Sequence, residues 1–209
     1  MNEGIRSLNK VEWSRRDLLK FAATGLLGGA ANSLLSHPQS AHAAETSNLN
    51  TKILIIYYSR SGNTREIANQ IHERVGGDIV EIQTVEPYPD DYNAVTKQAR
   101  QELDSGYKPP LKTKVETIRS YDVIFVGSPS WWSTIASPVR TFLSEHDLSG
   151  KTIVPFITHE GSELGRSVTD IMTICPNSTI LDGLAVRGRN AKTAQREVSE
   201  WLSRLGMKK

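Results

Sequence analysis

The stretch that most constrains the fold lies between Lys52 and Thr64. Residues 53–58 form an unbroken apolar and aromatic run, which is typical of a strand buried on both faces of a parallel sheet. A small polar cluster, 59–64, follows at once, and beyond it apolar residues recur at helical spacing as far as Val75. The sequence therefore predicts a strand, a tight loop and a helix in direct succession.

The polar cluster reads Ser59-Arg60-Ser61-Gly62-Asn63-Thr64. The first N–H groups of a helix have no partner within the helix, and the helix dipole favours an anion beside them. Hydroxyl and amide side chains add neutral donors, and the glycine permits positive φ. The cluster has no lysine, and it matches neither the ATP and GTP pattern nor the dinucleotide pattern. It predicts a monophosphate site; the alternative is an ordinary turn capped by Ser and Asn.

The rest of the chain alternates between two patterns. Four further strands are predicted at 78–83, 121–127, 151–158 and 179–186, each an apolar run bounded by turn residues. Apolar spacing predicts helices over 64–75, 92–103, 138–143 and 168–172, and a closing helix over 191–205. Five strands that alternate with five helices indicate an α/β domain with one parallel sheet covered on both faces.

Three loops follow the carboxyl ends of the first, third and fourth strands, at 59–64, 128–137 and 158–165. Ligands of such sheets bind beyond these ends. The stretch Tyr58-Ser59-Arg60-Ser61-Gly62-Asn63-Thr64 resembles the phosphate loop of the flavodoxin family, which binds FMN. The resemblance covers residues 52–205. It implies a doubly wound, flavodoxin-like sheet of order 2-1-3-4-5, with an uninterrupted fifth strand as in the short-chain members.

The second loop reads Gly127-Ser128-Pro129-Ser130-Trp131-Trp132. Two adjacent tryptophans after a buried strand are costly to leave in water unless something covers them. The resemblance implies that Trp131, at the family's usual spacing, stacks on the isoalloxazine ring of FMN. The pair Trp131-Trp132 is similar to a subfamily with Gly-x-Pro-x-Trp-Trp here. Packing of either ring into the core or a lid is the alternative.

The third loop contains His159 as its only ring, where flavodoxins often have an aromatic residue. One face of the flavin is therefore expected to be open to a substrate or partner. Histidine can hydrogen-bond a flavin edge or move a proton near neutral pH, and a surface histidine without a role is the alternative. No catalytic residue is predicted. By resemblance, the FMN contacts are Ser59, Arg60, Ser61, Gly62, Asn63, Thr64, Pro129, Ser130, Trp131, Trp132, Thr158, His159, Gly161 and Ser162.

Charge and cysteine content exclude several classes of site. The net charge is +2, and residues 1–43 hold five Lys or Arg and three Asp or Glu, so the body carries 20 of each sign. A neutral body gives no general attraction to nucleic acid, and it differs from the acidic flavodoxins. The single cysteine, Cys175, excludes an internal disulfide and a Cys-rich metal cluster. Its apolar neighbours predict a buried, unreactive thiol.

The first 43 residues have the pattern of an export signal. Ser14-Arg15-Arg16-Asp17-Leu18-Leu19-Lys20 precedes an apolar run over 21–35 and then Ala41-His42-Ala43. The paired arginines resemble the twin-arginine motif, which implies Tat export machinery, folding around a cofactor before export, cleavage after Ala43 and a periplasmic location. Residues 44–51 are predicted to be a flexible linker. The apolar run is too short and interrupted for a membrane span; an uncleaved anchor or a chance basic helix is the alternative.

Three functions are consistent with these patterns. The first is an exported FMN-binding electron-transfer protein that serves a redox partner protein or a small acceptor. The second is an FMN-dependent reductase of quinones or similar acceptors. The third is a flavin-free binding or signalling module on the same scaffold. Phosphoacceptor receivers need acidic residues where this chain has Tyr57, Tyr58, Gly127 and Ser128.

Overall fold

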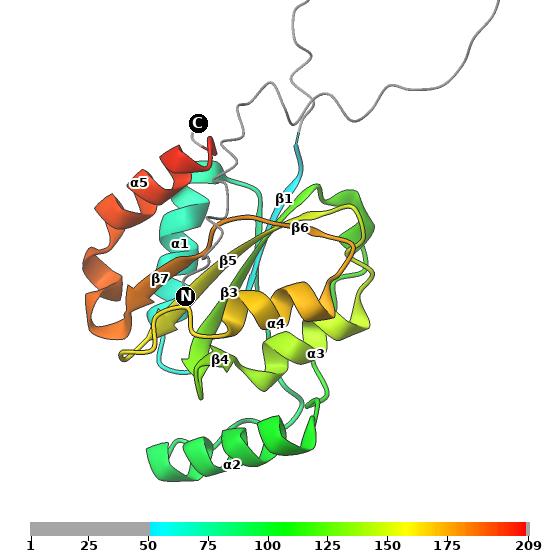
Figure 1. Ribbon diagram of the computed structural model, residues 1–209, viewed down its shortest axis with the longest axis vertical. Coiled ribbons are helices and arrows are strands. Elements are labelled where there is room, and N and C mark those ends of the chain that lie inside the picture. Colours follow the sequence, from blue (N-terminus) through cyan, green and yellow to red (C-terminus); the bar gives the residue numbers. More distant parts are fainter. Residues whose placement is uncertain (1–50, 208–209) are drawn as a thin grey trace, which may run out of the picture. The chain divides into compact units, whose positions relative to one another are not determined.

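A mainly parallel sheet forms the middle of the structure, and helices lie on both of its faces (Figure 1). The computed structural model describes residues 51–207. The predicted export signal, 1–43, and residues 44–50 of the predicted linker lie outside the described residues. Within 51–207, no helix combines the length and the hydropathy that crossing a membrane requires.

Seven strands of the described chain pair in the order β2-β1-β3-β5-β6, with β7 also paired to β5 and β4 to β3. They are β1 (Ile53–Tyr57), β2 (Asp78–Glu81), β3 (Val123–Trp131), β4 (Thr134–Ile135), β5 (Thr152–His159), β6 (Thr179–Ile180) and β7 (Leu184–Arg187). Every pair is parallel except β3 with β4. With β6 and β7 taken together as the last strand, the order is the predicted 2-1-3-4-5, and the doubly wound α/β fold is confirmed.

The described region contains five α-helices, four between strands and one after the last strand. They are α1 (Asn63–Val75), α2 (Tyr92–Ser105), α3 (Ser137–Glu145), α4 (Ser167–Ile174) and α5 (Gln195–Arg204). Two short 3-10 helices occupy Ile118–Ser120 and Gly188–Thr193. The closing helix is therefore shorter than the predicted 191–205, because the chain first makes the second of these 3-10 helices.

The last strand is interrupted, so the prediction of an uninterrupted fifth strand is wrong. β6 pairs with Thr152 and Ile153, and β7 pairs with β5 from Phe156 onward. Between them, three residues, 181–183, face only two residues of β5, one of which is Pro155. Proline has no N–H to donate to a ladder, and the surplus residue forms a bulge. The carbonyl of Asp182 accepts the indole N–H of Trp201 instead, at 2.9 Å.

The predicted loop 128–137 is largely a β-hairpin. β3 continues to Trp131 and turns back through Trp132 and Ser133 into β4, so that Trp131 pairs with Thr134. Both turn residues have left-handed backbone, with φ of 53° and 62°. Two-residue hairpin turns need such angles and usually obtain them from Asn-Gly or similar pairs. Trp-Ser carries no such signal, so the sequence did not reveal the hairpin.

The sheet has an apolar core on each face. Alternate residues of β1, Leu54 and Ile56, belong to the core under α3 and α4, which also contains the buried thiol of Cys175. Ile55 belongs to the opposite core under α1 and α5, together with Trp201. The predicted burial of the Cys175 thiol is confirmed, and burial raises its pKa to about 11.

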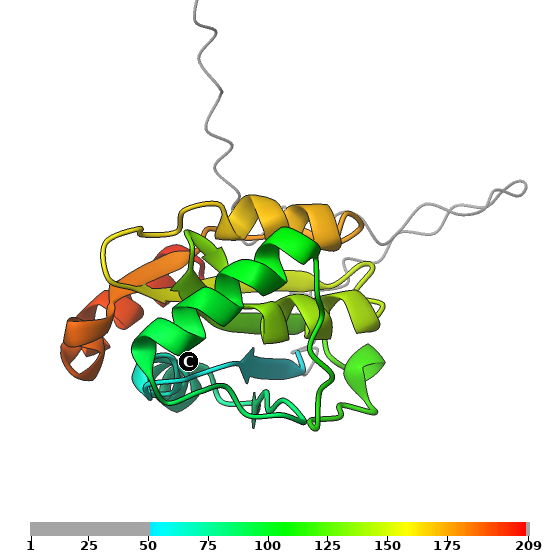
Figure 2. The same cartoon turned by 90° about the horizontal axis from the view of Figure 1, so that it is seen from below.

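Helix α2 departs from the expected arrangement of helices on the two faces. Figures 1 and 2 show it beyond the carboxyl ends of the strands, lying across the edge of the sheet. Only three of its residues, Val95, Ala99 and Glu102, are buried. The apolar spacing of 92–103 predicted a helix but could not specify which surface it covers. This position makes α2 a wall of the site described next.

Candidate functional site

A cavity of about 640 Å³ lies at the carboxyl edge of the sheet. All three predicted loops contribute to its lining, and so does α2. Its lining residues are Arg60, Ser61, Asn63, Tyr92, Val95, Thr96, Ala99, Pro129, Ser130, Trp131, Trp132, Thr158, His159, Glu160 and Gly188. The volume lies in the range of small-molecule and cofactor sites. Parallel pairing brings these loops together because the strands β1, β3 and β5 are neighbours and end at one edge.

The first loop leaves the start of α1 open to a ligand. Gly62 occupies the N-cap position with φ 89° and has no side chain to cap the helix. A Cβ built on Gly62 would have no atom within 4 Å, so the space in front of the turn is free. Ser59 Oγ accepts the N–H of Arg65 at 3.2 Å, which leaves the earlier N–H groups of the first turn uncapped by side chains. Ser61 and Asn63 line the cavity beside them.

Two buried polar atoms of cavity-lining residues have no hydrogen-bond partner in the structure. They are Nε of Arg60 and Nδ1 of His159. Arg60 donates through Nη2 to the backbone carbonyl of Asp90, just before α2. Buried polar groups are nearly always hydrogen-bonded, so orphaned atoms at a cavity indicate a polar ligand.

Hydrogen bonds join the three loops to one another. The hydroxyls of Thr64 and Thr158 lie 2.8 Å apart in a buried contact between the first and third loops. Those of Ser130 and Ser162 lie 2.6 Å apart and join the second and third loops. The first and second are joined where the N–H of Tyr58 donates to the carbonyl of Gly127. The relative positions of the loops are therefore fixed without a ligand.

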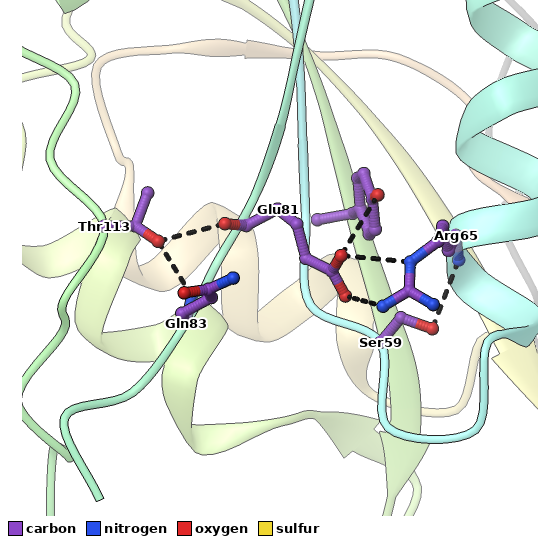
Figure 3. Close-up of polar contacts among 6 residues, drawn as sticks. Ser59, Arg65, Glu81, Gln83 and Thr113 are labelled. Carbon is purple, nitrogen blue, oxygen red and sulfur yellow. Dashed lines mark hydrogen bonds and ion pairs between the residues drawn. The ribbon is translucent and has the colours of Figure 1, made fainter. Parts of the chain in front are cut away.

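A polar network supports the first loop from the side of β2. Figure 3 shows Arg65 of α1 making two hydrogen bonds to the carboxylate of Glu81, at 3.0 and 2.7 Å. The backbone carbonyl of Glu81 accepts the hydroxyl of Thr113, which in turn accepts the N–H of Gln83. The ion pair is partly exposed, so its stabilising effect is small. Its geometry aligns α1 with the end of β2, beside the first loop.

Trp131 belongs to an aromatic cluster and also lines the cavity. Its ring meets those of Tyr58 and Tyr88 edge to face, with centroids 5.5 and 4.9 Å apart. Burial raises the pKa of Tyr58 to about 12. The pKa of Tyr88 is also raised, by burial and then by its hydrogen bond to Glu102. Both phenols are therefore neutral at physiological pH, and the cluster gives Trp131 rigid support.

The structure brings most of the predicted contacts together, but not all. Nine of the fourteen line the cavity: Arg60, Ser61, Asn63, Pro129, Ser130, Trp131, Trp132, Thr158 and His159. The remaining five do not line it: Ser59, Gly62, Thr64, Gly161 and Ser162. Thr64, for example, is 1% exposed and directs its hydroxyl to Thr158.

Six lining residues were not predicted from the sequence. Four belong to α2: Tyr92, Val95, Thr96 and Ala99. The other two are Glu160 and Gly188. A Cβ on Gly188 would lie 2.5 Å from both Asn63 Nδ2 and Glu160 Oε1, so this glycine lets the two side chains approach. A glycine directly after the last strand was the available signal for this position.

The residues present fit the FMN that the resemblance implies. The uncapped start of α1, with Ser61, Asn63 and the unpartnered Nε of Arg60, supplies hydrogen-bond donors to a phosphate. Trp131 supplies an aromatic surface in the same cavity. Among residues 51–207, no group of three His, Cys, Asp or Glu is placed to hold a metal ion.

The chain is similar to several known proteins. Two curated relatives, both named NAD(P)H dehydrogenase (quinone), come from Bradyrhizobium sp. strains BTAi1 and ORS 278. They are 31% and 32% identical over 150 residues, which cover 67% of this chain and 71% of each relative.

Solved structures agree with this similarity. A protein of Bacteroides eggerthii DSM 20697 is 33% identical with a TM-score of 0.67, and the match covers 76% of this chain and 100% of that one. A flavoprotein of Lactobacillus acidophilus NCFM, solved in complex with FMN, is 25% identical with a TM-score of 0.58, covering 68% of this chain and 97% of that one.

The flavodoxin family model matches residues 52–205, the segment that the phosphate-loop resemblance covered. This range contains the complete sheet, all five helices of the described chain and every residue that lines the cavity. The chain therefore belongs to the flavodoxin family.

Proposed function

We propose that this protein is an FMN-dependent oxidoreductase whose acceptor is a small planar molecule of the quinone class. Two findings support FMN as the cofactor: the family match and the FMN bound by the flavoprotein of Lactobacillus acidophilus. The single observation that carries the choice of acceptor is the α2 wall, because it adds the uncharged residues Tyr92, Val95, Thr96 and Ala99 to the cavity that the three FMN-contacting loops form. The names of the curated relatives are consistent with a quinone acceptor.

FMN supplies one- and two-electron redox chemistry when it is bound. The chain's own residues bind and orient it. The first loop and the start of α1 would hold the phosphate through Ser61, Asn63 and Arg60, while Trp131 would support the ring. We further infer that the chain belongs to the Gly-x-Pro-x-Trp-Trp subfamily, because both tryptophans line the cavity.

His159 is the residue best placed to serve the proton requirement of the reaction. A quinone becomes a hydroquinone by taking up two electrons and two protons. The ring of His159 lines the cavity, and its buried Nδ1 has no hydrogen-bond partner in the structure. Histidine is the side chain best suited to donating and accepting protons near neutral pH.

The test is reconstitution followed by steady-state assay. Protein purified with excess FMN should be yellow. It should also reduce a naphthoquinone when NADH, NADPH or a chemically reduced electron-carrier protein is supplied as the electron donor. Protein that binds FMN but reduces no quinone with any donor would contradict the proposed acceptor. Protein that stays colourless and does not quench the emission of added FMN would contradict the cofactor itself.

An electron carrier that serves a redox partner protein is the second candidate. Trp132 and Tyr92 are 50% and 68% exposed beside the cavity, and exposed aromatic rings are common in protein contact surfaces. Stopped-flow mixing of the reduced protein with a cytochrome would show fast one-electron transfer if this candidate is correct. A slow reaction with cytochrome and a fast one with quinone would favour the reductase.

We also propose export by the twin-arginine route. Arg15-Arg16 followed by an apolar run and Ala41-His42-Ala43 supports cleavage after Ala43 and a periplasmic location. This route suits a protein that acquires FMN before export. Replacing both arginines by lysine should keep the full-length protein in the cytoplasm, as fractionation and N-terminal sequencing would reveal. Unchanged export of the double variant would refute this route.

A further inference from the structure

We propose that Tyr92 and Trp132 form an acceptor-binding subsite that selects planar aromatic acceptors by stacking. This inference rests on the proposed oxidoreductase function and names the residues that determine its specificity. It starts from α2, whose residues Val95 and Ala99 face the cavity and are only 3% and 4% exposed. None of the residues that α2 contributes to the lining is charged. The α2 wall therefore suits a neutral, apolar molecule.

The tip of the β3–β4 hairpin fixes the position of Trp132 against α2. The indole N–H of Trp132 donates to the backbone carbonyl of Thr96 at 3.0 Å. The guanidinium carbon of Arg100 lies 5.3 Å from the centroid of the same ring. Both contacts join the hairpin to α2. The indole of Trp132 therefore holds the α2 wall in place, and Trp132 also lines the cavity.

The backbone at this tip is strained, and residues 165–166 pack against it. Trp132 and Ser133 have φ of 53° and 62°, which is costly for residues with a Cβ. The carbonyl of Ser133 accepts the N–H of Arg166 at 2.7 Å. Gly165 approaches so closely that a Cβ there would lie 2.3 Å from the same carbonyl. Surroundings that maintain an unfavourable conformation indicate a functional requirement for the position of Trp132.

Two exposed aromatic rings at one cavity indicate a third ring that covers them. Tyr92, in the first turn of α2, has no hydrogen-bond partner in the structure and no packing reason to be aromatic. Aromatic pairs stabilise contact by about 0.5–1.5 kcal/mol beyond area burial, or roughly 2- to 13-fold in affinity. A fused bicyclic acceptor offers each ring a surface. An acceptor with no fused ring system offers less surface.

The experiment measures acceptor binding and turnover separately. Oxidised, FMN-loaded protein without any reductant is titrated with 2-methyl-1,4-naphthoquinone, so that no turnover occurs, and Kd is read from tryptophan fluorescence or calorimetry. Tyr92→Ala should raise this Kd, and the steady-state KM for the naphthoquinone, about 3- to 10-fold. The kcat for the naphthoquinone, the reaction with ferricyanide and the Kd for FMN should each stay within about twofold.

Tyr107→Ala is the matched control, because Tyr107 is a similarly exposed aromatic residue (52%) just beyond the other end of α2 and does not line this cavity. It should change none of these quantities. Trp132→Phe keeps a ring but removes the N–H that bonds Thr96, and it should give an intermediate rise in the naphthoquinone Kd. Trp132→Ala should give the largest rise.

The outcomes are distinguishable. Unaltered naphthoquinone binding in Tyr92→Ala would overturn the subsite, even if the protein is an active reductase. Loss of FMN binding in Trp132→Phe would assign Trp132 to the cofactor and overturn its role here. Absence of quinone reduction in the unmodified protein, with naphthoquinone binding that still depends on Tyr92, would refute the proposed function and leave the binding site established.

Discussion

At the scale of single residues, Gly165 and Gly150 separate two reasons for a glycine. Both have left-handed backbone, with φ of 49° and 73°. A Cβ on Gly150 would meet nothing within 4 Å, whereas on Gly165 it would clash with the backbone of Ser133. Gly150 is required only by its own backbone conformation, whereas Gly165 is also required by the hairpin that carries Trp132.

Replacing each of them by alanine should therefore have different effects. Gly150→Ala should lower the free energy of unfolding by about 1 kcal/mol, since only the backbone conformation is disfavoured. Gly165→Ala should lower it by roughly 1–3 kcal/mol more, because Ser133 must move. Urea denaturation measures both. Equal losses in the two variants would show that the hairpin tip yields easily to a Cβ.

Tyr58 should make stability depend on pH in the alkaline range. Burial raises its pKa to about 12 in the folded protein, above the ordinary value of 10.0 that applies to the unfolded chain. Folding thus favours the neutral phenol of Tyr58. The stability that this phenol contributes is fully present below pH 10 and is lost as the pH rises toward 12. Tyr58→Phe cannot ionise, so its urea midpoint should fall less between pH 9 and 11 than that of the unmodified protein. Parallel declines would contradict this assignment.

At the scale of elements, Asp170 joins three of them. Its carboxylate in α4 accepts hydrogen bonds from Arg140 of α3 and Thr134 of β4. The side chains of Arg140 and Asp170 are only 21% and 20% exposed. The pair therefore connects the hairpin with the two helices that cover one face of the sheet.

Asp170→Ala should lower the free energy of unfolding by about 1.5–3 kcal/mol, because it leaves a largely buried guanidinium without its charge partner. The control is Asp104→Ala, which removes an exposed i,i+4 ion pair with Arg100. This change should alter the free energy of unfolding by less than about 0.5 kcal/mol. Thermal and urea unfolding would both report the difference. A loss in Asp170→Ala no larger than in the control would mean that Arg140 finds other partners.

At the scale of the whole molecule, the site unites loops from three strands, so its ligand should stabilise the entire fold. A ligand present at 100 times its Kd stabilises the folded state by about 2.7 kcal/mol. For a domain of this size, that corresponds to a rise in Tm of about 5–10 °C. Differential scanning calorimetry with and without FMN tests this, with riboflavin as the comparison that lacks the phosphate. An equal rise with riboflavin would contradict the role of the first loop.

Much of this architecture was predictable because it depends on short-range patterns. A strand, a tight polar loop and a helix followed from the run 53–58, the cluster 59–64 and the spacing to Val75. The alternation repeated along the chain determined a parallel sheet. The order of the strands and the meeting of three loops at one edge followed from the family resemblance and the handedness of crossovers.

What the sequence by itself determined, then, was each element's type and the edge at which a ligand binds, since these depend on residue periodicity and local backbone preference. The tertiary structure alone decided that α2 crosses the strand ends, that Trp132 turns back toward Thr96, and that the last strand bulges opposite Pro155. These features depend on contacts between residues far apart in the chain. No local pattern encodes such contacts, because their free energy exists only once the distant partners have met.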